Sequence, residues 1–429
     1  MENKNQESAP THPNQRLGSP SHESRSASSN EQAQKWSRPE SPQHERHTSV
    51  QSPKRGKNAN LPPPSFPQEI VVEILSNLPV KSLIRLRYVS KSWESLITDP
   101  FFIKKHLKRT RKDPTFSKQR VLMSTASAEP IQDSIRSFCL NAIYKDSIVN
   151  TTEIEYPSNE VCRSHRIVGS CNGLICIATR KDTVFLLNPA LRVFKKLPDL
   201  GFKHRGPCNS VYGFGFDASV NDYKVVRVFC YRSTAVENGV CVYSLKTNCW
   251  RKIPDFPPGF PMKAGKHVDG SLNWAVVRRQ GMDFFCYIVS LDLAEETYTE
   301  VLQPSYGDDA VHVRTLGVLD GCLCLTCNYG RSYADVWVMK EYGNSESWTK
   351  LFSIPFTLHP FRFEDFRTPL FVSETGEILM RLGENLVMYN PKENASRILG
   401  FPNDAISYIR EVFVYEESLV SPIVGDRHR

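Results

Sequence analysis

The chain has 429 residues, 40% of them hydrophobic and 23% charged, which gives room for two or three domains with sizeable cores. No run approaches the ~18 apolar residues that a membrane span needs, and the first residues lack the apolar region of a secretory signal. We therefore expect no membrane contact, a place in the cytoplasm or nucleus, and reduced thiols for the twelve cysteines.

The net charge of +8 is concentrated at the front of the chain. Residues 1–60 hold nine Lys or Arg against six Asp or Glu, residues 61–112 hold ten against four, and the other 317 residues hold 35 against 36. Because phosphate affinity rises with the number of available cations, the neutral remainder argues against a nucleic-acid ligand. Residues 1–60 are also rich in Ser, Pro, Gln and Asn, which predicts a disordered tail.

Residues 66–107 predict consecutive short helices. Ser65 can cap the first helix, Gln68 completes a capping box with it, and Pro67 fits the first turn. Pro79 cannot continue that helix, so the chain turns and a second helix starts there. The apolar side chains recur every three or four positions, as amphipathic helices require, at Ile70, Val71, Ile74, Leu75, Leu78, Val80, Leu83, Ile84, Leu86, Trp93, Leu96, Ile97 and, in one more short helix after Pro100, at Phe101, Phe102, Ile103 and Leu107.

From about residue 116 the sequence changes to apolar runs of roughly four to eight residues, rich in β-branched and aromatic side chains and separated by Pro and Gly. Examples are LICIA, VFLL and VCVYSL. This composition predicts an all-β domain. Many of the runs are apolar without alternation, so we expect their strands to be covered on both faces.

Two markers recur in the β region with a period near fifty. One is an aromatic residue spaced by 56, 48 and 50 positions, at Phe194, Trp250, Tyr298 and Trp348. The other is a Gly just before a strand, at Gly173, Gly270, Gly321 and Gly376. Its gaps are 97, 51 and 55 residues, and the first gap spans two periods, with Asp222-Tyr223 in place of the missing Gly. With about four strands per period over roughly 300 residues, they predict an all-β propeller of about six degenerate kelch-like blades.

Four short motifs stand at fixed spacing in the helical segment: Phe66-Pro67 with Ile70, Ile74-Leu75 with Leu78-Pro79, Val89-Ser90-Lys91 with Trp93, and Asp99-Pro100 with Phe102. With this spacing the segment resembles an F-box, with Phe66 in place of the usual Leu. The β region, from SCNGLICIA through LLNPALRVFKKLP and YGFGFDASVNDYKVVRV, resembles the F-box-associated, kelch-like domain of plant F-box proteins. We expect a tail over 1–60, an F-box helical module over 61–110 and a propeller over 116–420.

In the F-box family, these helices bind the Skp-type adaptor of a cullin-based SCF ubiquitin ligase. The resemblance therefore implies a non-catalytic substrate receptor that needs no cofactor and whose propeller binds a client protein of unknown identity. The adaptor surface is acidic in the family, which suits the basic balance of residues 61–112. The adaptor-binding residues that the resemblance implies are Phe66, Pro67, Ile70, Ile74, Leu75, Leu78, Pro79, Leu83, Leu86, Val89, Lys91 and Trp93.

Other interpretations stay open. The apolar stripe can instead pack within the module and on the propeller, and Trp93 can equally be an internal core residue. The propeller can be a binding protein outside any ligase, for protein, glycan or nucleic acid, with Arg278-Arg279 or PFRFEDFR (residues 360–367) as its footprint. It can also be an enzyme, if Tyr, His and Cys side chains hold copper around the central axis.

No catalytic or metal motif is complete in the sequence. GFPMKAGKH (residues 259–267) has five residues between its two glycines where a phosphate loop needs four, and its second Lys is followed by His. YGFGFD lacks the third Gly and the helix of a dinucleotide site. Cys322 and Cys324 fall on one face of a strand and Cys327 on the other, so we expect buried thiols and no metal site.

Overall fold

The computed structural model describes most of the chain after residue 66, within a compact unit that spans Ser65–Arg429. The predicted tail, Ser65 and Phe66 lie outside the described residues. The structure describes residues 67–110, 119–126, 133–145, 148–156, 165–180, 182–200, 208–231, 238–280, 283–306, 313–329, 332–355, 369–401 and 408–423.

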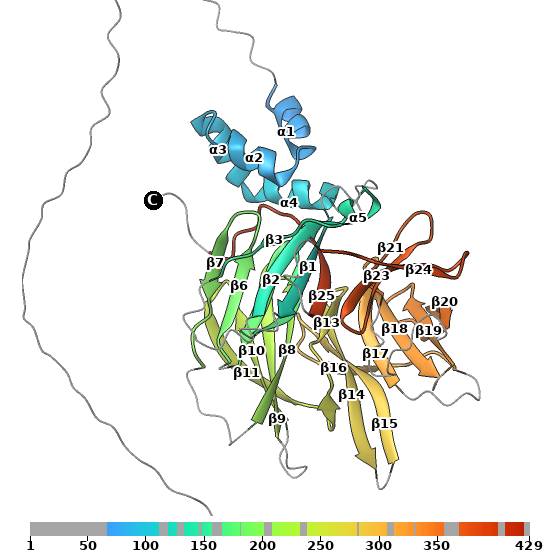
Figure 1. Cartoon of the computed structure of the whole chain (residues 1–429). Helices are drawn as coiled ribbons and strands as arrows, with labels where there is room; N and C mark the ends of the chain where they lie inside the picture. Colours follow the sequence, from blue (N-terminus) through green and yellow to red (C-terminus); the bar gives the residue numbers. More distant parts are fainter. Residues whose placement is uncertain are drawn as a thin grey trace, which may run out of the picture. The chain divides into compact units, whose positions relative to one another are not determined.

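Four helices open the described chain (Figure 1): α1 (Gln68–Ser76), α2 (Val80–Leu86), α3 (Lys91–Thr98) and α4 (Pro100–Thr110). The predicted break is confirmed, because Pro79 is the N-cap of α2. The predicted capping box is wrong. Pro67 takes the N-cap position of α1, so Gln68 is the first helical residue and cannot reach back as the third one does.

Side chains cap the third and fourth helices. Ser90 Oγ accepts a hydrogen bond from the N–H of Trp93 at 3.2 Å. Asp99 Oδ1 accepts hydrogen bonds from the N–H groups of Phe101 at 2.8 Å and Phe102 at 3.1 Å. These bonds satisfy donors of the first helical turn, which have no partner within the helix.

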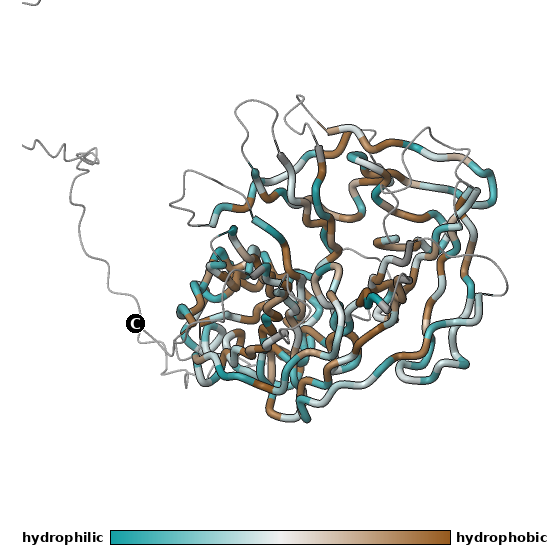
Figure 2. The backbone as a smooth tube through the Cα atoms, turned by 90° about the horizontal axis from the view of Figure 1, so that it is seen from below, coloured by the Kyte–Doolittle hydropathy of each residue, from teal (hydrophilic) through white to brown (hydrophobic). Residues whose placement is uncertain are grey.

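Six antiparallel sheets follow, and we number them as blades 1 to 6 (Figures 1 and 2). Figure 2 shows brown, apolar stretches in alternation with teal, hydrophilic ones along the chain. Blade 1 also carries the short helix α5 (Ala142–Lys145), and blade 5 the 3-10 turn η1 (Ser345–Ser347). In spatial order the strands are β25 (Tyr408–Glu416), β1 (Gln119–Ala126), β2 (Asp133–Cys139) and β3 (Thr152–Glu153) in blade 1; β4 (His165–Cys171), β5 (Leu174–Thr179), β6 (Val184–Asn188) and β7 (Val193–Lys196) in blade 2; β8 (Cys208–Asp217), β9 (Asp222–Tyr231), β10 (Asn238–Ser244) and β11 (Cys249–Phe256) in blade 3; β12 (Phe260–Pro261) and β13 (Lys266–Val268) beside β14 (Ser271–Gln280), then β15 (Asp283–Asp292) and β16 (Tyr298–Val301) in blade 4; β17 (Val313–Leu319), β18 (Cys322–Tyr329), β19 (Tyr333–Met339) and β20 (Trp348–Pro355) in blade 5; and β21 (Phe371–Val372), β22 (Ile378–Leu382), β23 (Asn385–Asn390) and β24 (Ala395–Ile398) in blade 6.

The six-bladed propeller confirms the predicted fold, and its ring is closed by strands from the two ends of the β region. β25 pairs with β1, with Val414 opposite Val121 and Phe413 opposite Leu122. The last strand that the structure describes thereby becomes the innermost strand of blade 1. This pairing leaves the ring without an open sheet edge between its ends.

The glycine marker corresponds to tight turns between the first two strands of a blade. Gly173 has a φ of +80° and follows Asn172 with a φ of +53°. Asp269-Gly270 and Asp320-Gly321 have the same pair of positive φ values. Two successive positive φ values characterise the type I′ turn, which prefers Asn-Gly and Asp-Gly.

The aromatic marker joins neighbouring blades on their outer strands. Trp250 Nε1 donates a hydrogen bond to the carbonyl oxygen of Pro198 at 2.8 Å, from blade 3 to the end of blade 2. The Tyr298 hydroxyl donates to the Pro254 carbonyl at 3.1 Å, from blade 4 to blade 3. Trp348 Nε1 donates to the carbonyl of Leu302 at 2.9 Å, from blade 5 to blade 4. The period of about fifty is therefore the spacing of an inter-blade contact; Phe194, which has no polar side-chain atom, cannot make it.

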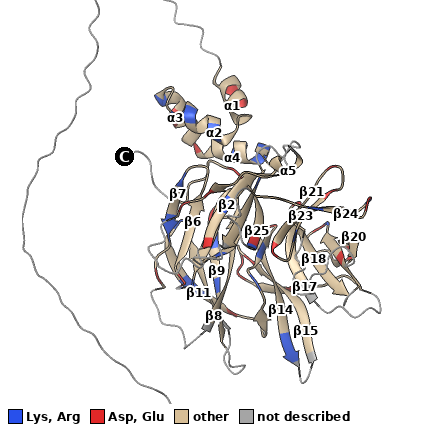
Figure 3. Ribbon diagram, in the orientation of Figure 1, with Lys and Arg blue, Asp and Glu red and all other residues tan. Residues whose placement is uncertain are grey.

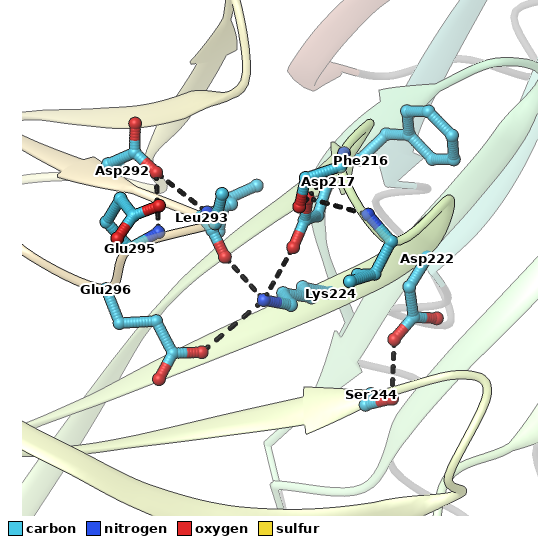
Figure 4. Close-up of polar contacts among 12 residues, drawn as sticks. Phe216, Asp217, Asp222, Lys224, Ser244, Asp292, Leu293, Glu295 and Glu296 are labelled. Atoms are coloured by element: carbon cyan, nitrogen blue, oxygen red, sulfur yellow. Dashed lines mark hydrogen bonds and ion pairs between the residues drawn. The ribbon is translucent and has the colours of Figure 1, made fainter.

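The cores of the propeller lie between blades. Each of six apolar clusters joins one blade to the next around the ring, including blade 6 to blade 1. A buried polar contact adds to one of them (Figure 4): Lys224 of blade 3 pairs with Asp217 at 2.8 Å and with Glu296 of blade 4 at 3.4 Å. Covering both faces of each sheet explains the continuous apolar runs.

Candidate functional site: the exposed face of the helical module

The helical module, residues 67–110, has a small core of its own. Leu75, Val80, Leu83, Ile97 and Phe102 are buried against one another. Leu75 and Leu83, which the sequence analysis placed among the adaptor contacts, are 2% and 0% exposed and face the interior of the module. They stabilise the helices that carry the surface residues.

An apolar ridge lies outside this core. We define the ridge as Ile70 and Ile74 on α1, Tyr88 and Val89 after α2, and Phe101 on α4. Ile74 is 56% exposed, Tyr88 88% and Phe101 85%. Five large apolar side chains exposed in so short a segment make the module a candidate for an interaction surface.

The sequence prediction included three members of this ridge, Ile70, Ile74 and Val89, and missed two. Tyr88 follows α2 outside its apolar period, and Phe101 stands next to Phe102, which enters the core. The sequence did contain a signal for Phe101, namely the aromatic pair after Pro100. Adjacent residues on a helix point in different directions, so one of the pair should be exposed when the other is buried.

The other predicted residues have intermediate or polar surroundings. Leu78, Leu86 and Trp93 are half-buried and pack against the core of the module. Pro67, Pro79 and Lys91 are exposed, and Lys91 Nζ pairs with Glu94 at 3.3 Å. Trp93 thus serves the core in part and the surface in part.

The ridge lies in basic surroundings. Residues 67–110 hold eight Lys or Arg against four Asp or Glu, and Figure 3 shows blue segments along α2, α3 and α4. Glu73 of α1 is engaged by α4: Lys105 Nζ lies 3.1 Å from its carboxylate, and Arg109 also bonds it. The hydrogen bonds from Arg109 and Lys105 hold the pKa of Glu73 below its usual range.

The module is joined to the propeller by the chain that follows β25. Leu419 is buried in the core of the module, together with the half-buried Ala190 and Leu191 of blade 2. Asn188 organises both segments. Its Nδ2 donates to the carbonyl oxygens of Ser418 at 2.9 Å and Val420 at 2.7 Å, and its Oδ1 accepts from the N–H groups of Ala190 and Leu191.

The incomplete motifs of the sequence have structural positions of their own. YGFGFD lies in β8, and GFPMKAGKH spans β12 and β13. Cys322, Cys324 and Cys327 lie in β18, where burial raises the pKa of the Cys324 thiol. Within the described residues, His, Cys, Asp and Glu side chains form no cluster of three that would suit a metal ion. In the same residues no helix has the length and apolar character to cross a membrane.

Comparisons with known proteins agree with this architecture. Residues 64–105 match the F-box domain, and residues 130–422 match the F-box associated beta propeller domain. The chain belongs to the F-box proteins with an F-box-associated propeller. The F-box/kelch-repeat protein At3g23880 of Arabidopsis thaliana is 32% identical over 370 residues, covering 84% of this chain and 96% of the relative. The F-box protein CPR1 of the same plant is 32% identical over 394 residues, covering 84% and 90%.

Proposed function

We propose that this F-box protein is the substrate receptor of an SCF-type ubiquitin ligase. The F-box binds a Skp-type adaptor and, through it, a cullin scaffold, and the propeller binds a client protein. The receptor supplies no catalytic group and needs no cofactor. It acts in the cytoplasm or nucleus by holding the client near the ubiquitin-charged enzyme, which converts a rare encounter into an effectively intramolecular transfer.

The observation that carries this proposal is the exposed ridge on an F-box. Ile74 and its neighbours lie on helices whose own core is already filled by Leu75, Leu83 and Phe102. Exposed apolar side chains of an amphipathic helix are well suited to fill a groove in a partner. The basic surroundings favour a partner with acidic groups and a fast encounter with it.

We propose a revised set of adaptor contacts on this basis. The ridge residues make the apolar contact, and the exposed Pro67, Pro79 and Lys91 border it. Leu78, Leu86 and Trp93 contribute through the parts of their side chains that the core leaves open. Phe66 stays in the set from the sequence alone.

Ile74→Asp tests the proposal. Because Ile74 is exposed, the change should alter the free energy of unfolding by less than about 0.5 kcal/mol. It should weaken binding to a purified Skp-type adaptor by about tenfold or more, since a charge would enter an apolar contact. Leu351→Asp on β20 is the matched control, because Leu351 is also exposed and lies in blade 5. An Ile74→Asp variant that folds and binds the adaptor as the parent does would refute docking through the ridge.

A further inference from the structure

A central channel passes between the inner strands of the propeller. Its volume is about 1660 Å³, and β4, β8, β13, β17, β21 and β25 line it. The described lining residues include eight Lys or Arg, two of them on α4, and four Asp or Glu. The 317 residues from 113 onward are almost neutral, with 35 Lys or Arg against 36 Asp or Glu. Without the two lysines of α4, the lining holds six Lys or Arg against four Asp or Glu, a positive balance that the propeller as a whole does not have.

The short strand β13 brings one of these cations into the channel. The N–H of Gly265, just before β13, donates to the Tyr212 carbonyl of β8 at 2.8 Å. A Cβ at Gly265 would lie 2.5 Å from the Trp274 ring, and one at Gly213 would lie 2.8 Å from it. Glycine at both positions permits this close approach. These are glycines of GFPMKAGKH and YGFGFD, and they fix the backbone immediately before Lys266.

Lys266 extends across the channel toward blade 1. Its Nζ lies 4.9 Å from the centroid of the Phe413 ring on β25, a cation–π contact. The Lys266 amine makes no hydrogen bond or ion pair with any residue that the structure describes. Burial lowers the pKa of Lys266, and the nearby Glu411 charge acts in the opposite direction. In its protonated form the amine has three N–H donors, which are available to a ligand in the channel.

One carboxylate, Glu411 of β25, lies among the channel cations. Glu411 Oε2 accepts a hydrogen bond from the N–H of Ile167 at 2.7 Å, next to a register shift in β4. Burial raises the pKa of Glu411, and the Ile167 hydrogen bond and the charges of Lys266, Arg166 and Arg381 act in the opposite direction. Three cations thus act on a single carboxylate.

The two arginines bond main-chain carbonyls in the channel wall. Arg166 Nη2 donates to the Ser210 carbonyl at 3.3 Å, and Arg381 Nε donates to the Gly383 carbonyl at 2.7 Å. A carbonyl oxygen orients a guanidinium without cancelling its charge. A channel with cationic walls of low dielectric constant concentrates anions from solution.

We propose that the channel binds a small, multiply charged oxyanion of the phosphate class, held by Lys266 with Arg166 and Arg381. Lysine and arginine bond phosphate oxygens through charge-assisted hydrogen bonds, and the oxyanion would balance the excess positive charge. The site lies within the propeller, so its occupancy does not depend on the adaptor proposal. It gives the receptor a ligand site on the axis about which its blades are arranged.

Calorimetric titration of the full chain with sodium pyrophosphate, at constant ionic strength, tests this proposal. The parent should show saturable binding at one site. Lys266→Gln should weaken it by at least about tenfold, through the loss of charged hydrogen bonds. Lys392→Gln is the matched control, because Lys392 is exposed on a turn of blade 6, and it should bind as the parent does. Absence of saturable binding, or equal binding by a folded Lys266→Gln variant, would overturn the proposal.

Glu411→Gln provides a test of opposite sign. It removes the negative charge among the three cations, so pyrophosphate should bind several-fold more tightly than to the parent. Thermal unfolding without pyrophosphate shows whether the variant is folded. Equal or weaker binding by folded Glu411→Gln would contradict an electrostatic site at this place. Titration with inorganic phosphate should give weaker binding than pyrophosphate, and equal affinity would contradict selection for multiple charge.

Discussion

In helix α1 of the F-box, the neighbours Ile74 and Leu75 have opposite surroundings, since Ile74 is exposed and Leu75 is buried. In strand β5 of the propeller, all six residues from Leu174 to Thr179 are buried. Leu174 and Cys176 pack toward blade 3, and Ile175 and Ile177 pack toward blade 1. Each blade is covered on two faces by its neighbours, whereas the helices of the module are covered on one.

This difference separates a closed region from an open one. The pairing of β25 with β1 completes the ring, so every blade has two neighbours. The module has a core of about five side chains and takes in Leu419 to complete it, yet still exposes Tyr88 and Phe101. A domain this small has little interior for its apolar side chains, and a partner surface can cover those that are left outside.

The largest effect is expected from the two neighbours in α1. Leu75→Ala should lower the free energy of unfolding by about 2–5 kcal/mol, because it opens a cavity in the small core. Ile74→Ala should lower it by less than about 0.5 kcal/mol, because Ile74 lies at the surface. Urea denaturation of both variants measures the difference. Equal losses would show that the module has no separate ridge and core.

A buried histidine should make the propeller sensitive to acid. His165 Nδ1 bonds the Tyr156 hydroxyl at 2.8 Å and Nε2 bonds Ser124 Oγ at 3.1 Å. Burial, with a smaller contribution from the Arg410 charge, lowers the pKa of His165 from 6.5 to about 4. The unfolded chain therefore binds a proton between these values that the folded chain does not. The contribution of His165 to the free energy of unfolding is therefore fully present above pH 6.5. It is lost as the pH falls toward 4, by at most about 3 kcal/mol.

His165→Gln checks this prediction. The variant has no titrating group at this position, so it should lose less stability than the parent between pH 7.5 and pH 4.5. Urea denaturation at the two pH values gives the comparison. Identical losses in both proteins would assign the acid sensitivity to other groups.

A smaller effect should come from the join between the two regions. Asn188→Ala should cost about 1–3 kcal/mol, because it leaves buried carbonyl and N–H groups of the joined segments without their partner. Asn390 at the corresponding turn of blade 6 is the matched control, since among the described residues its Oδ1 accepts from the nearby N–H groups of Lys392 and Glu393 and from no distant segment. Asn390→Ala should cost less than Asn188→Ala. Equal losses of stability in thermal unfolding of the two variants would show that Asn188 stabilises only its own turn.

Much of the fold was predictable because local sequence determines it. Asn172-Gly173 and Asp269-Gly270 need the positive φ values of tight turns, and Pro79 ends a helix wherever it occurs in such a run. The period of the aromatic marker gave the number of blades to within one. Its cause, the bonds from Trp250, Tyr298 and Trp348 to the preceding blade, needed the structure, because each partner lies more than forty residues away.

The sequence by itself determined the order of the parts: an F-box with its motif spacing, followed by about six repeats of strands covered on both faces. Periodicity predicts the helices and the repeated strands, because it reflects local geometry, and the motif spacing indicates the F-box by resemblance. Only the tertiary structure decided that Leu75 is buried and Ile74 exposed, that β25 closes the ring on β1, and that Lys266 enters the channel. These outcomes depend on which distant segments share a surface, and no local propensity specifies that.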